Sequence, residues 1–501
     1  MRNTMIFLAY FLYVCLLLAL AKFLKRVCWT PFLLQYKLKK QGIKGPSYKF
    51  LHGNIKEISA MRKQSMAKTI PGLFHNIFPK ILPHVHTWTN LYGKNYLNWQ
   101  GSQAELVVTQ VELVEEILSN KEGFYPKLCL KGYAKKLLGD GLSSSEGEKW
   151  TKMRKLSNHV FHADSLKSMI PAMIKSSEVM LEKWKNYEGE EIEVFQEFRV
   201  LTSEVISKTA FGSSYLEGKN MFDMLMHLTL LVSRNIHKIR FPLISKIFKS
   251  SDDLESDKLE KGIKDCIREI IQRRETSTPG EGGFLEKLME AKWMTEDDII
   301  DECKTFYFAG HETTTSLLSW TMLLLATHQE WQHKAREEVL QIFGQNNPNS
   351  AGIPRLKIMN MIIEESLRLY PPIPNIKRRV TKEVRLGNMI LPPKLELYIS
   401  PLALHHDPKI WGEDVHQFKP ERFAKGVANA TITKTRAAFL PFGYGPRTCV
   451  GLNFAIVESK IALAMILQRF VFTLSPTYVH LPVQIFSIRP LHGIHIVLQT
   501  I

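Results

Sequence analysis

The chain has 501 residues, of which 45% are hydrophobic and 23% are charged, with 28 glycines and 24 prolines. These fractions are typical of a globular protein and exclude a disordered, a collagen-like or a small disulfide-stabilised class. The formal net charge is +17, and residues 1–80 hold fourteen lysines and arginines but one acid, Glu57, so the remaining chain is nearly neutral.

The first predicted element is a membrane-spanning helix. Residues 5–21 carry no charge, residues 22–26 contain three basic residues, and further basic residues follow. A secretory signal peptide is the competing interpretation, because an Ala-Leu-Ala sequence at 19–21 fits the first half of a cleavage site. Basic and still apolar sequence follows it, which favours a retained anchor. The positive-inside rule then places the rest of the chain in the cytosol. Because the charges flank an apolar segment, we expect contact with lipid headgroups and no nucleic-acid partner.

The chain divides into three predicted parts. Residues 1–27 form the signal anchor with its basic flank. Residues 28–49 form a basic linker that ends in a stiff glycine- and proline-containing hinge at 42–46. Residues 50–501 show no break strong enough for a second boundary, so we expect one globular domain there.

Helical periodicity dominates this domain, with strand-like alternation in a smaller share. We therefore predict a mostly helical α+β fold with small sheets. The expected helices are 165–186, 199–211, 253–274, 295–327, 330–343, 354–369 and 452–470. The expected strands lie within 95–109, within 376–400 and at the C-terminal end, and the expected exposed loops are 274–283 and 346–349.

The longest predicted helix, 295–327, has a polar interruption in its middle. Its start is marked by Thr295 and by the acid three residues later, as in a capping box. At position 309 begins the sequence AGHETT, whose glycine weakens a helix interior. This sequence allows close helix packing with an internally bonded threonine. It also allows a flat ligand to approach the backbone, with Thr313 one turn beyond Ala309.

One cysteine stands in unusual surroundings. Residues 440–454 read LPFGYGPRTCVGLNF, so Cys449 precedes a predicted helix and lies close to Arg447. We expect its thiol to be shifted toward thiolate there. A nucleophile would need a paired histidine, and nothing links His405 or His406 to it. A single thiolate metal ligand is the remaining chemistry, as in oxygen-activating haem enzymes. The six cysteines include no C-x-x-C pair, which argues against a zinc site.

Residues 442–451 match F-x-x-G-x-R-x-C-x-G, and the chain resembles the cytochrome P450 family in this haem-binding signature. Four further motifs follow the family order, and the resemblance covers essentially the whole chain. They are W-x-x-x-R at Trp150 and Arg154, AGHETT at 309–314, E-x-x-R at Glu365 and Arg368, and PERF at 420–423. Several stretches look most like the plant clan numbered seventy-two, and within it the subfamily numbered seven hundred and forty-nine.

The resemblance implies the cytochrome P450 fold with haem b as cofactor and Cys449 as the axial ligand of its iron. It also implies several sets of site residues. The implied haem contacts are Phe442, Arg447, Trp150, Arg154 and Arg378, with Arg379 as the alternative to Arg378. The implied proton-delivery residues are Thr313 and Glu312, and the implied structural triad is Glu365, Arg368 and Arg422. The implied substrate pocket includes Phe306, Ala309, Ile373 and Phe486, with the segments 122–140 and 215–245.

The function implied by the resemblance is a monooxygenase. It would use O₂ and electrons from NADPH, delivered by NADPH–cytochrome P450 reductase, to oxidise an apolar small molecule. Members of the resembled clan oxidise terpenoid-derived plant hormones and metabolites. The implied location is the endoplasmic reticulum membrane, as a single-pass protein whose domain faces the cytosol. A basic patch of Lys149, Lys152 and Lys155 would suit reductase docking, although a solvated surface fits as well. A reductase-independent isomerase or dehydratase and a non-enzymatic haem protein are the alternatives.

Overall fold

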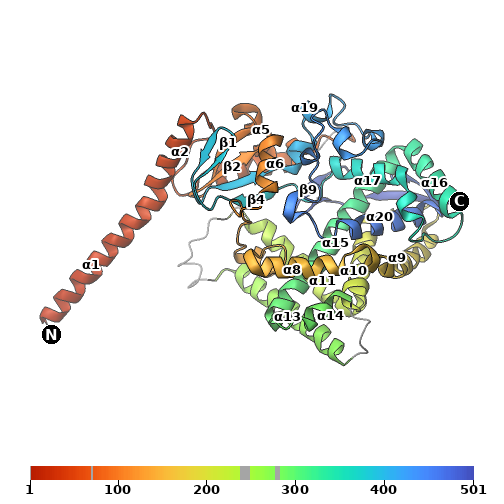
Figure 1. Cartoon of the computed structure of the whole chain (residues 1–501), viewed down its shortest axis with the longest axis horizontal. Helices are drawn as coiled ribbons and strands as arrows, with labels where there is room; N and C mark the ends of the chain where they lie inside the picture. Colours follow the sequence, from red (N-terminus) through yellow and green to blue (C-terminus); the bar gives the residue numbers. More distant parts are fainter. Residues whose placement is uncertain (1, 69–71, 237, 239–248, 277–282) are drawn as a thin grey trace.

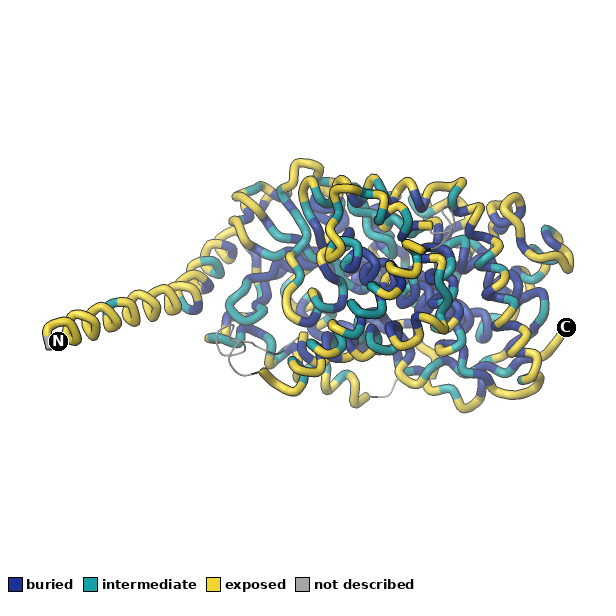
Figure 2. Tube along the Cα trace, turned by 90° about the horizontal axis from the view of Figure 1, so that it is seen from below, coloured by how far each residue is buried: buried dark blue, intermediate teal, exposed yellow. Residues whose placement is uncertain are grey.

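An N-terminal helical rod projects from the body of the protein (Figure 1). The computed structural model describes residues 2–68, 72–236, 238, 249–276 and 283–501. Within those residues one helix, Asn3–Lys40, is long and apolar enough to cross a membrane. Its first part is exposed along nearly its whole length (Figure 2). In chain order the rod consists of α1 (Arg2–Leu24), the π-helical turn η1 (Lys25–Trp29) and α2 (Thr30–Lys40).

The second half of this rod is docked on the body. Val27 and Leu38 are buried. The Tyr48 hydroxyl donates a hydrogen bond of 2.5 Å to the Val27 carbonyl. The Tyr48 ring packs edge-on between Phe32 and Trp99. Apolar burial and an aromatic stack therefore hold the rod where it meets the body.

Hydrogen bonds join the predicted hinge segment, 42–46, and its neighbour Gln41 to the body. The Gln41 side chain exchanges two hydrogen bonds with the Ile390 backbone, at 2.7 and 3.1 Å. The Leu97 amide donates to the Lys44 carbonyl at 2.9 Å. Glycine at position 45 allows the segment to pack closely on β1 (Asn95–Gln100), because a Cβ there would lie 1.9 Å from the Leu97 carbonyl oxygen.

The largest sheet lies next to this docking site and has the strand order β1-β2-β7-β4. β2 and β7 are parallel, and the other neighbours are antiparallel. These strands are β1 (Asn95–Gln100), β2 (Gln103–Val108), β4 (Ile376–Arg379) and β7 (Glu396–Ile399). A three-stranded sheet joins β3 (Glu191–Glu193), β11 (His495–Thr500) and β8 (Phe470–Leu474). Two hairpins are β5 (Val384–Leu386) with β6 (Met389–Leu391), and β9 (Pro482–Gln484) with β10 (Ile488–Pro490).

Helices form the rest of the body, so the predicted fold class is confirmed. Those before the central helix are α3 (Ile55–Ala67), α4 (Phe78–Ile81), α5 (Pro83–Tyr92), α6 (Val111–Ser119), α7 (Gly132–Leu138), α8 (Gly147–Val160), α9 (Ala163–Trp184), α10 (Val194–Phe211), α11 (Tyr215–Asn235), α13 (Ser251–Glu275) and α14 (Gly283–Glu290). The central helix and its successors are α15 (Glu296–Thr327), α16 (Gln329–Phe343), α17 (Lys357–Leu369), α18 (Pro401–His405), α19 (Pro408–Trp411) and α20 (Leu452–Leu467).

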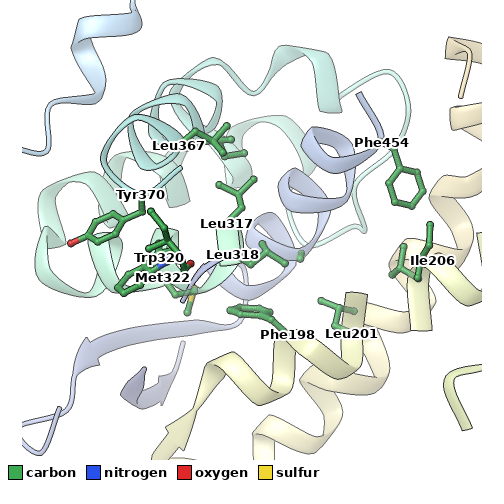
Figure 3. Close-up of a cluster of buried hydrophobic side chains, with 14 of the residues drawn as sticks. Phe198, Leu201, Ile206, Leu317, Leu318, Trp320, Met322, Leu367, Tyr370 and Phe454 are labelled. Atoms are coloured by element: carbon green, nitrogen blue, oxygen red, sulfur yellow. Dashed lines mark hydrogen bonds between the residues drawn. The ribbon is translucent and has the colours of Figure 1, made fainter. Parts of the chain in front are cut away.

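Helix α15 passes through the core and is buried on all sides over most of its length. Figure 3 shows its apolar side chains between those of α10, the end of α17 and α20. Trp320 stacks on Tyr370 with ring centroids 4.3 Å apart, and its indole nitrogen donates to the Ile488 carbonyl at 3.0 Å. A helix apolar all round belongs in the interior of a large domain, which explains this position.

The predicted helices exist, and most begin within two residues of the prediction, but two begin three or more residues away. α10 begins at Val194, five residues before the prediction, because the Glu193 carboxylate accepts the first free backbone amides. α17 begins at Lys357, because Pro354 belongs to a separate 3₁₀ turn. The predicted loop 346–349 lies between α16 and α17 and is confirmed. Residues 277–282 of the other predicted loop lie outside the described residues.

Candidate functional site

The cysteine-bearing loop has one tightly fixed backbone path. Its 3₁₀ turn covers Gly445–Arg447, and α20 begins three residues after Cys449. The Cys449 amide donates to the Phe442 carbonyl at 2.8 Å. Gly445 has a φ of +70°, and a Cβ there would lie 2.2 Å from the Leu118 carbonyl oxygen. Only glycine fits this close approach, so the motif glycine fixes where the loop carries its sulfur.

The Cys449 thiol lies deep in the fold and still keeps accessible surface. Burial raises its pKa, while the Gly451 amide, Arg154 and Lys127 lower it. Burial prevails, so the expectation that the loop alone shifts the thiol toward thiolate is wrong. A bound metal cation favours the deprotonated sulfur directly, since metal binding displaces the thiol proton.

Basic side chains gather around this cysteine from several elements. The Arg447 guanidinium lies 3.8 Å from the centroid of the Trp150 ring and donates to the Ser145 carbonyl at 2.9 Å. Arg154, one turn after Trp150 on α8, donates to the Thr448 carbonyl. The W-x-x-x-R motif and the cysteine loop are therefore in direct contact.

The two adjacent arginines of β4 have different surroundings. Arg378 is 6% exposed, and its pKa is lowered to about 10 by burial and then by Arg447. Arg379 instead pairs with Glu396 at 2.8 Å. The structure therefore puts Arg378, and not Arg379, into the basic group around Cys449.

Two residues beside Cys449 were not predicted, the basic residue Lys127 and the acid Glu146. Burial, Arg378 and Arg447 lower the pKa of Lys127 to about 7, although Glu146 and Cys449 act in the opposite direction. Its Nζ donates to the Ser143 carbonyl at 2.9 Å. The Glu146 carboxylate accepts the Lys127 amide at 2.6 Å and pairs with Arg447. Glu146 stands four residues before Trp150, the single sequence signal for it, and Lys127 has none.

This basic group fits haem. We define it as Lys127, Arg154, Arg378 and Arg447, and among the described residues one carboxylate, Glu146, pairs with it. Buried cations in excess favour further anions, and an arginine fork suits carboxylates such as the two propionates of haem. A single accessible cysteine beside them supplies one sulfur ligand for the iron. The donor set thus matches both charged parts of this cofactor.

Helix α15 opens one small accessible face in an otherwise buried stretch. Ala309 is exposed and Gly310 and Thr313 are half-buried, whereas the stretches of the helix before and after them are buried. The Thr313 hydroxyl donates to the Ala309 carbonyl at 2.7 Å. A Cβ on Gly310 would lie 2.8 Å from Ile206 of α10, so this glycine serves close packing. The packing and the ligand-approach interpretations of AGHETT therefore hold for different residues of the motif.

Glu312 is bonded away from this face. It is 3% exposed, and its Oε1 accepts the Ser487 hydroxyl at 2.5 Å. Ser487 lies in the turn between β9 and β10, and no sequence pattern links the two residues. The acid next to Thr313 is thus held by a segment 175 residues away.

The Glu365 and Arg368 pair is fully buried and not a surface contact. Arg368 donates two hydrogen bonds of 2.7 Å to Glu365, and it also donates to the carbonyls of His405 and Val415. The Arg422 Nε lies 3.6 Å from the Glu365 carboxylate. These contacts connect α17 to the segment that precedes the cysteine loop.

Of the predicted pocket residues, Phe306 is the most deeply buried. It is 7% exposed, stacked on Phe161 at 5.4 Å and packed against Phe284 at 4.2 Å, so it belongs to the core. Ile373 and Phe486 are half-buried. Part of the predicted pocket segment 215–245, residues 237 and 239–245, lies outside the described residues.

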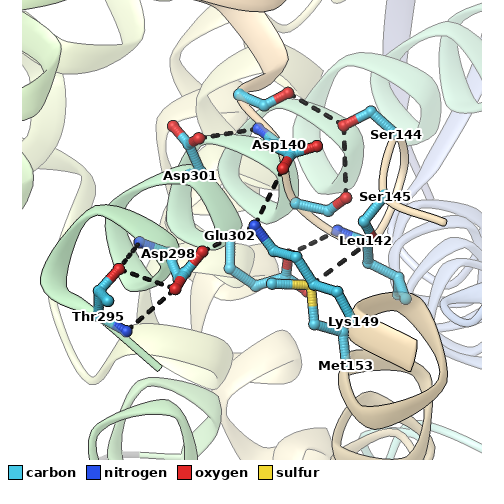
Figure 4. Close-up of polar contacts among 12 residues, drawn as sticks. Asp140, Leu142, Ser144, Ser145, Lys149, Met153, Thr295, Asp298, Asp301 and Glu302 are labelled. Atoms are coloured by element: carbon cyan, nitrogen blue, oxygen red, sulfur yellow. Dashed lines mark hydrogen bonds and ion pairs between the residues drawn. The ribbon is translucent and has the colours of Figure 1, made fainter. Parts of the chain in front are cut away.

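The predicted basic docking patch is largely neutralised. Lys149 pairs with Asp140 at 3.0 Å and with Asp298 at 2.7 Å (Figure 4). Lys152 pairs with Glu148. These acids were not considered in the prediction, and the lysines that they neutralise offer little attraction to an acidic partner.

Comparison with known proteins agrees with this site. The cytochrome P450 family description matches residues 72–492. Cytochrome P450 CYP749A22 of Panax ginseng is 54% identical, over 98% of this chain and 96% of its own length. Secologanin synthase 1 of Catharanthus roseus is 38% identical, over 94% and 93%. The 11-oxo-beta-amyrin 30-oxidase of Glycyrrhiza uralensis is 39% identical, over the same shares.

Proposed function

Because this chain belongs to the cytochrome P450 family of haem-dependent oxidoreductases, we propose that it inserts an oxygen atom into an apolar, terpenoid-derived small molecule. The observation that carries the proposal is the accessible Cys449 thiol beside the basic group. A relative that is named as an oxidase of 11-oxo-beta-amyrin, a triterpenoid, supports the substrate class.

The protein's own residues would divide the work. Cys449 would ligate the iron, and Arg154, Arg378, Arg447 and Lys127 would hold the propionates. When bound, haem b supplies the activation of O₂, one atom of which enters the substrate while the other leaves as water.

Proton delivery would belong to α15. The Thr313 hydroxyl stands on the accessible face and uses its hydrogen to bond the Ala309 carbonyl, which leaves its oxygen lone pairs free to accept a proton. A proton taken up there can be passed on as the hydroxyl turns. Glu312 would supply protons to this hydroxyl when its carboxylate releases the Ser487 hydroxyl and turns toward the accessible face.

Electrons would come from NADPH through a membrane-bound reductase. We place the protein in the endoplasmic reticulum membrane, spanned once by α1, with the body in the cytosol. The exposed apolar surface of α1 and the basic residues that follow it support this topology.

The test uses the full-length protein in microsomes with a plant NADPH–cytochrome P450 reductase and a panel of triterpenoids, gibberellins and brassinosteroids. We expect O₂ consumption that requires NADPH and a product 16 mass units heavier than one of these substrates. Cys449→Ala should abolish both, and Cys15→Ala, an exposed cysteine of α1 outside the body, should not. Turnover without NADPH would instead identify an isomerase or dehydratase, and haem binding without turnover of any panel member would contradict the proposed substrate class.

A further inference from the structure

A cavity lies against the β9–β10 hairpin. Its volume is about 400 Å³, and it is bounded by the start of α10, the later turns of α11 and the hairpin. Met226, Leu230 and Ile485 give it an apolar wall, and Arg199 and Arg489 are the two arginines that line it. A volume of this size with an apolar wall and a few charged groups is typical of a small-molecule site.

Arg489 is buried in this wall with few acceptors. It is 8% exposed. Its one hydrogen bond to a described residue joins Nη1 to the Met226 sulfur at 3.1 Å. A guanidinium carries five N–H donors, and a thioether is a weak acceptor. A buried cation with so few partners is costly unless another acceptor is present.

The Arg199 side chain also has few polar partners among the described residues. Its Nε is buried without a hydrogen-bond partner. Its ion pair with Asp223 spans 3.8 Å, and that side chain is 48% exposed, so the pair contributes little. The acid of the cavity, Glu193, already accepts the backbone amides of three residues, namely Phe195, Gln196 and Ile494.

The two arginines lie close enough to affect each other and His311 electrostatically. Burial lowers the pKa of His311 on α15, and both Arg199 and Arg489 lower it further. Arg199 also lowers the pKa of Arg489, after burial. Glu312 acts on Arg489 in the opposite direction, but its Oε1 is bonded to Ser487. Two cations that repel each other beside an apolar wall are stabilised together by one anion between them.

We propose that this cavity binds a small amphipathic carboxylic acid, with its carboxylate held by Arg489 and Arg199 and its carbon skeleton against Met226, Leu230 and Ile485. The arginine fork matches a carboxylate with two parallel hydrogen bonds. The site is separate from Cys449, because none of the residues that line the cavity belongs to the cysteine loop, to the basic group or to the accessible face of α15. An occupant therefore contacts the hairpin from outside the catalytic face.

The test uses the full-length holoprotein in lipid nanodiscs, with an azole inhibitor on the haem so that small acids cannot enter there. The probe is cyclohexanecarboxylate at pH 7.5, followed by ligand-observed NMR. Its neutral partner of the same shape is cyclohexanecarboxamide. We expect saturable binding of the acid and at least tenfold weaker binding of the amide. Equal affinities, or no saturable binding of the acid, would overturn the proposal. Sulfate that competes as well as the acid would contradict a role for the apolar wall.

Variants assign the site to the arginines. Arg489→Gln should weaken the acid at least tenfold and Arg199→Gln at least fivefold, and both should leave the weak binding of the amide unchanged. Arg355→Gln, an exposed arginine far from the cavity in the chain, is the matched control and should bind as the unaltered protein does. Unchanged affinity in both cavity variants would sink the assignment. If Arg489→Gln does not incorporate haem, Arg199→Gln and the amide comparison still decide.

Discussion

Two opposing effects act on the pKa of the Cys449 thiol. Burial raises the pKa, and the nearby cations Arg154 and Lys127 lower it. Cys449→His should retain some haem but lose the red-shifted band of the reduced carbonyl spectrum, because imidazole donates less electron density than thiolate. Cys449→Ala should lose that band as well. Cys303→Ala removes another buried cysteine and should keep it. A Cys449→Ala protein with the wild-type band would refute the ligand assignment.

Thr313 is the second residue whose role is testable alone. Thr313→Ala should leave the haem spectrum nearly unchanged while product per NADPH falls several-fold and hydrogen peroxide rises, because the accessible hydroxyl that would carry protons is gone. Thr321→Ala is a close control, since its hydroxyl makes the same bond one turn back, at 2.8 Å, but is buried. Wild-type coupling in Thr313→Ala would remove this residue from the proton path.

Residue types in a fixed order allowed Cys449, Trp150, Arg154 and Arg447 to be predicted together, because a motif encodes local backbone and chemistry at once. Lys127 could not be found in this way. Its contacts with the basic group arise from a loop whose path depends on packing, and a single lysine in a loop carries no periodic signal. Phe306 was predicted to line the pocket and packs among buried side chains, and the sequence does not separate the two because an aromatic residue fits a core and a pocket equally well.

Among the elements, α17 shows how burial changes the contribution of an ion pair, Glu365 with Arg368, to stability. Arg368→Leu should lower the free energy of unfolding by about 3–5 kcal/mol, because it leaves the Glu365 carboxylate buried without its partner. Arg268→Leu breaks an exposed pair with Glu296 at 2.7 Å and should cost under about 1 kcal/mol. Denaturant unfolding of the holoproteins measures both, and equal losses would contradict the buried role.

The sequence spacing of Glu365 and Arg368 is that of an ordinary solvent-exposed helix pair. Its burial depends on the carbonyls of His405 and Val415, which lie 37 and 47 residues beyond Arg368. Helix existence could be predicted from apolar periodicity, whereas such long-range closure could not, because no local pattern specifies which distant carbonyl is met. The early start of α10 has a different cause, because Glu193 caps the helix locally through the amides of Phe195 and Gln196.

The connection between α15 and the loop after α7 is sensitive to pH. Glu302 is fully buried and accepts the Leu142 amide at 2.6 Å (Figure 4). Burial raises its pKa from 4.5 to about 7. The native state therefore holds a proton that the unfolded chain releases, so this carboxyl lowers stability progressively as pH rises from about 4.5 to 7, by up to ~3 kcal/mol.

Glu302→Gln keeps an amide oxygen for Leu142 and carries no charge. We expect its unfolding midpoint to match the unaltered protein near pH 5 and to exceed it at pH 8. Glu330→Gln, at an exposed position of α16, should show no such divergence. Parallel pH profiles for Glu302→Gln and the unaltered protein would show that Glu302 does not titrate in this range.

At the scale of the whole molecule, two truncations separate the membrane from the fold. Removal of residues 2–24 should weaken membrane association and leave haem content intact, because this part is exposed (Figure 2). Removal of residues 2–40 should also lower the thermal midpoint by several degrees, because it strips Val27 and Leu38 from Tyr48 and Trp99. Sedimentation with membranes and a thermal melt of each protein measure the two effects. Loss of folded haem protein in the shorter deletion would contradict this division.

The docked rod also determines which side of the body faces the membrane. The elements α1, η1 and α2 follow one another without a break, and Tyr48 fixes the last part of the rod to the body. The rotation of the body about the rod axis is therefore set by the helix. Each residue added to a helix turns the rest of the chain by about 100° about the helix axis. One extra alanine within α1, near Phe23, would thus rotate the body about the rod axis and turn another side of it toward the lipid headgroups. Seven extra alanines would nearly restore the original orientation and would move the body farther from the membrane.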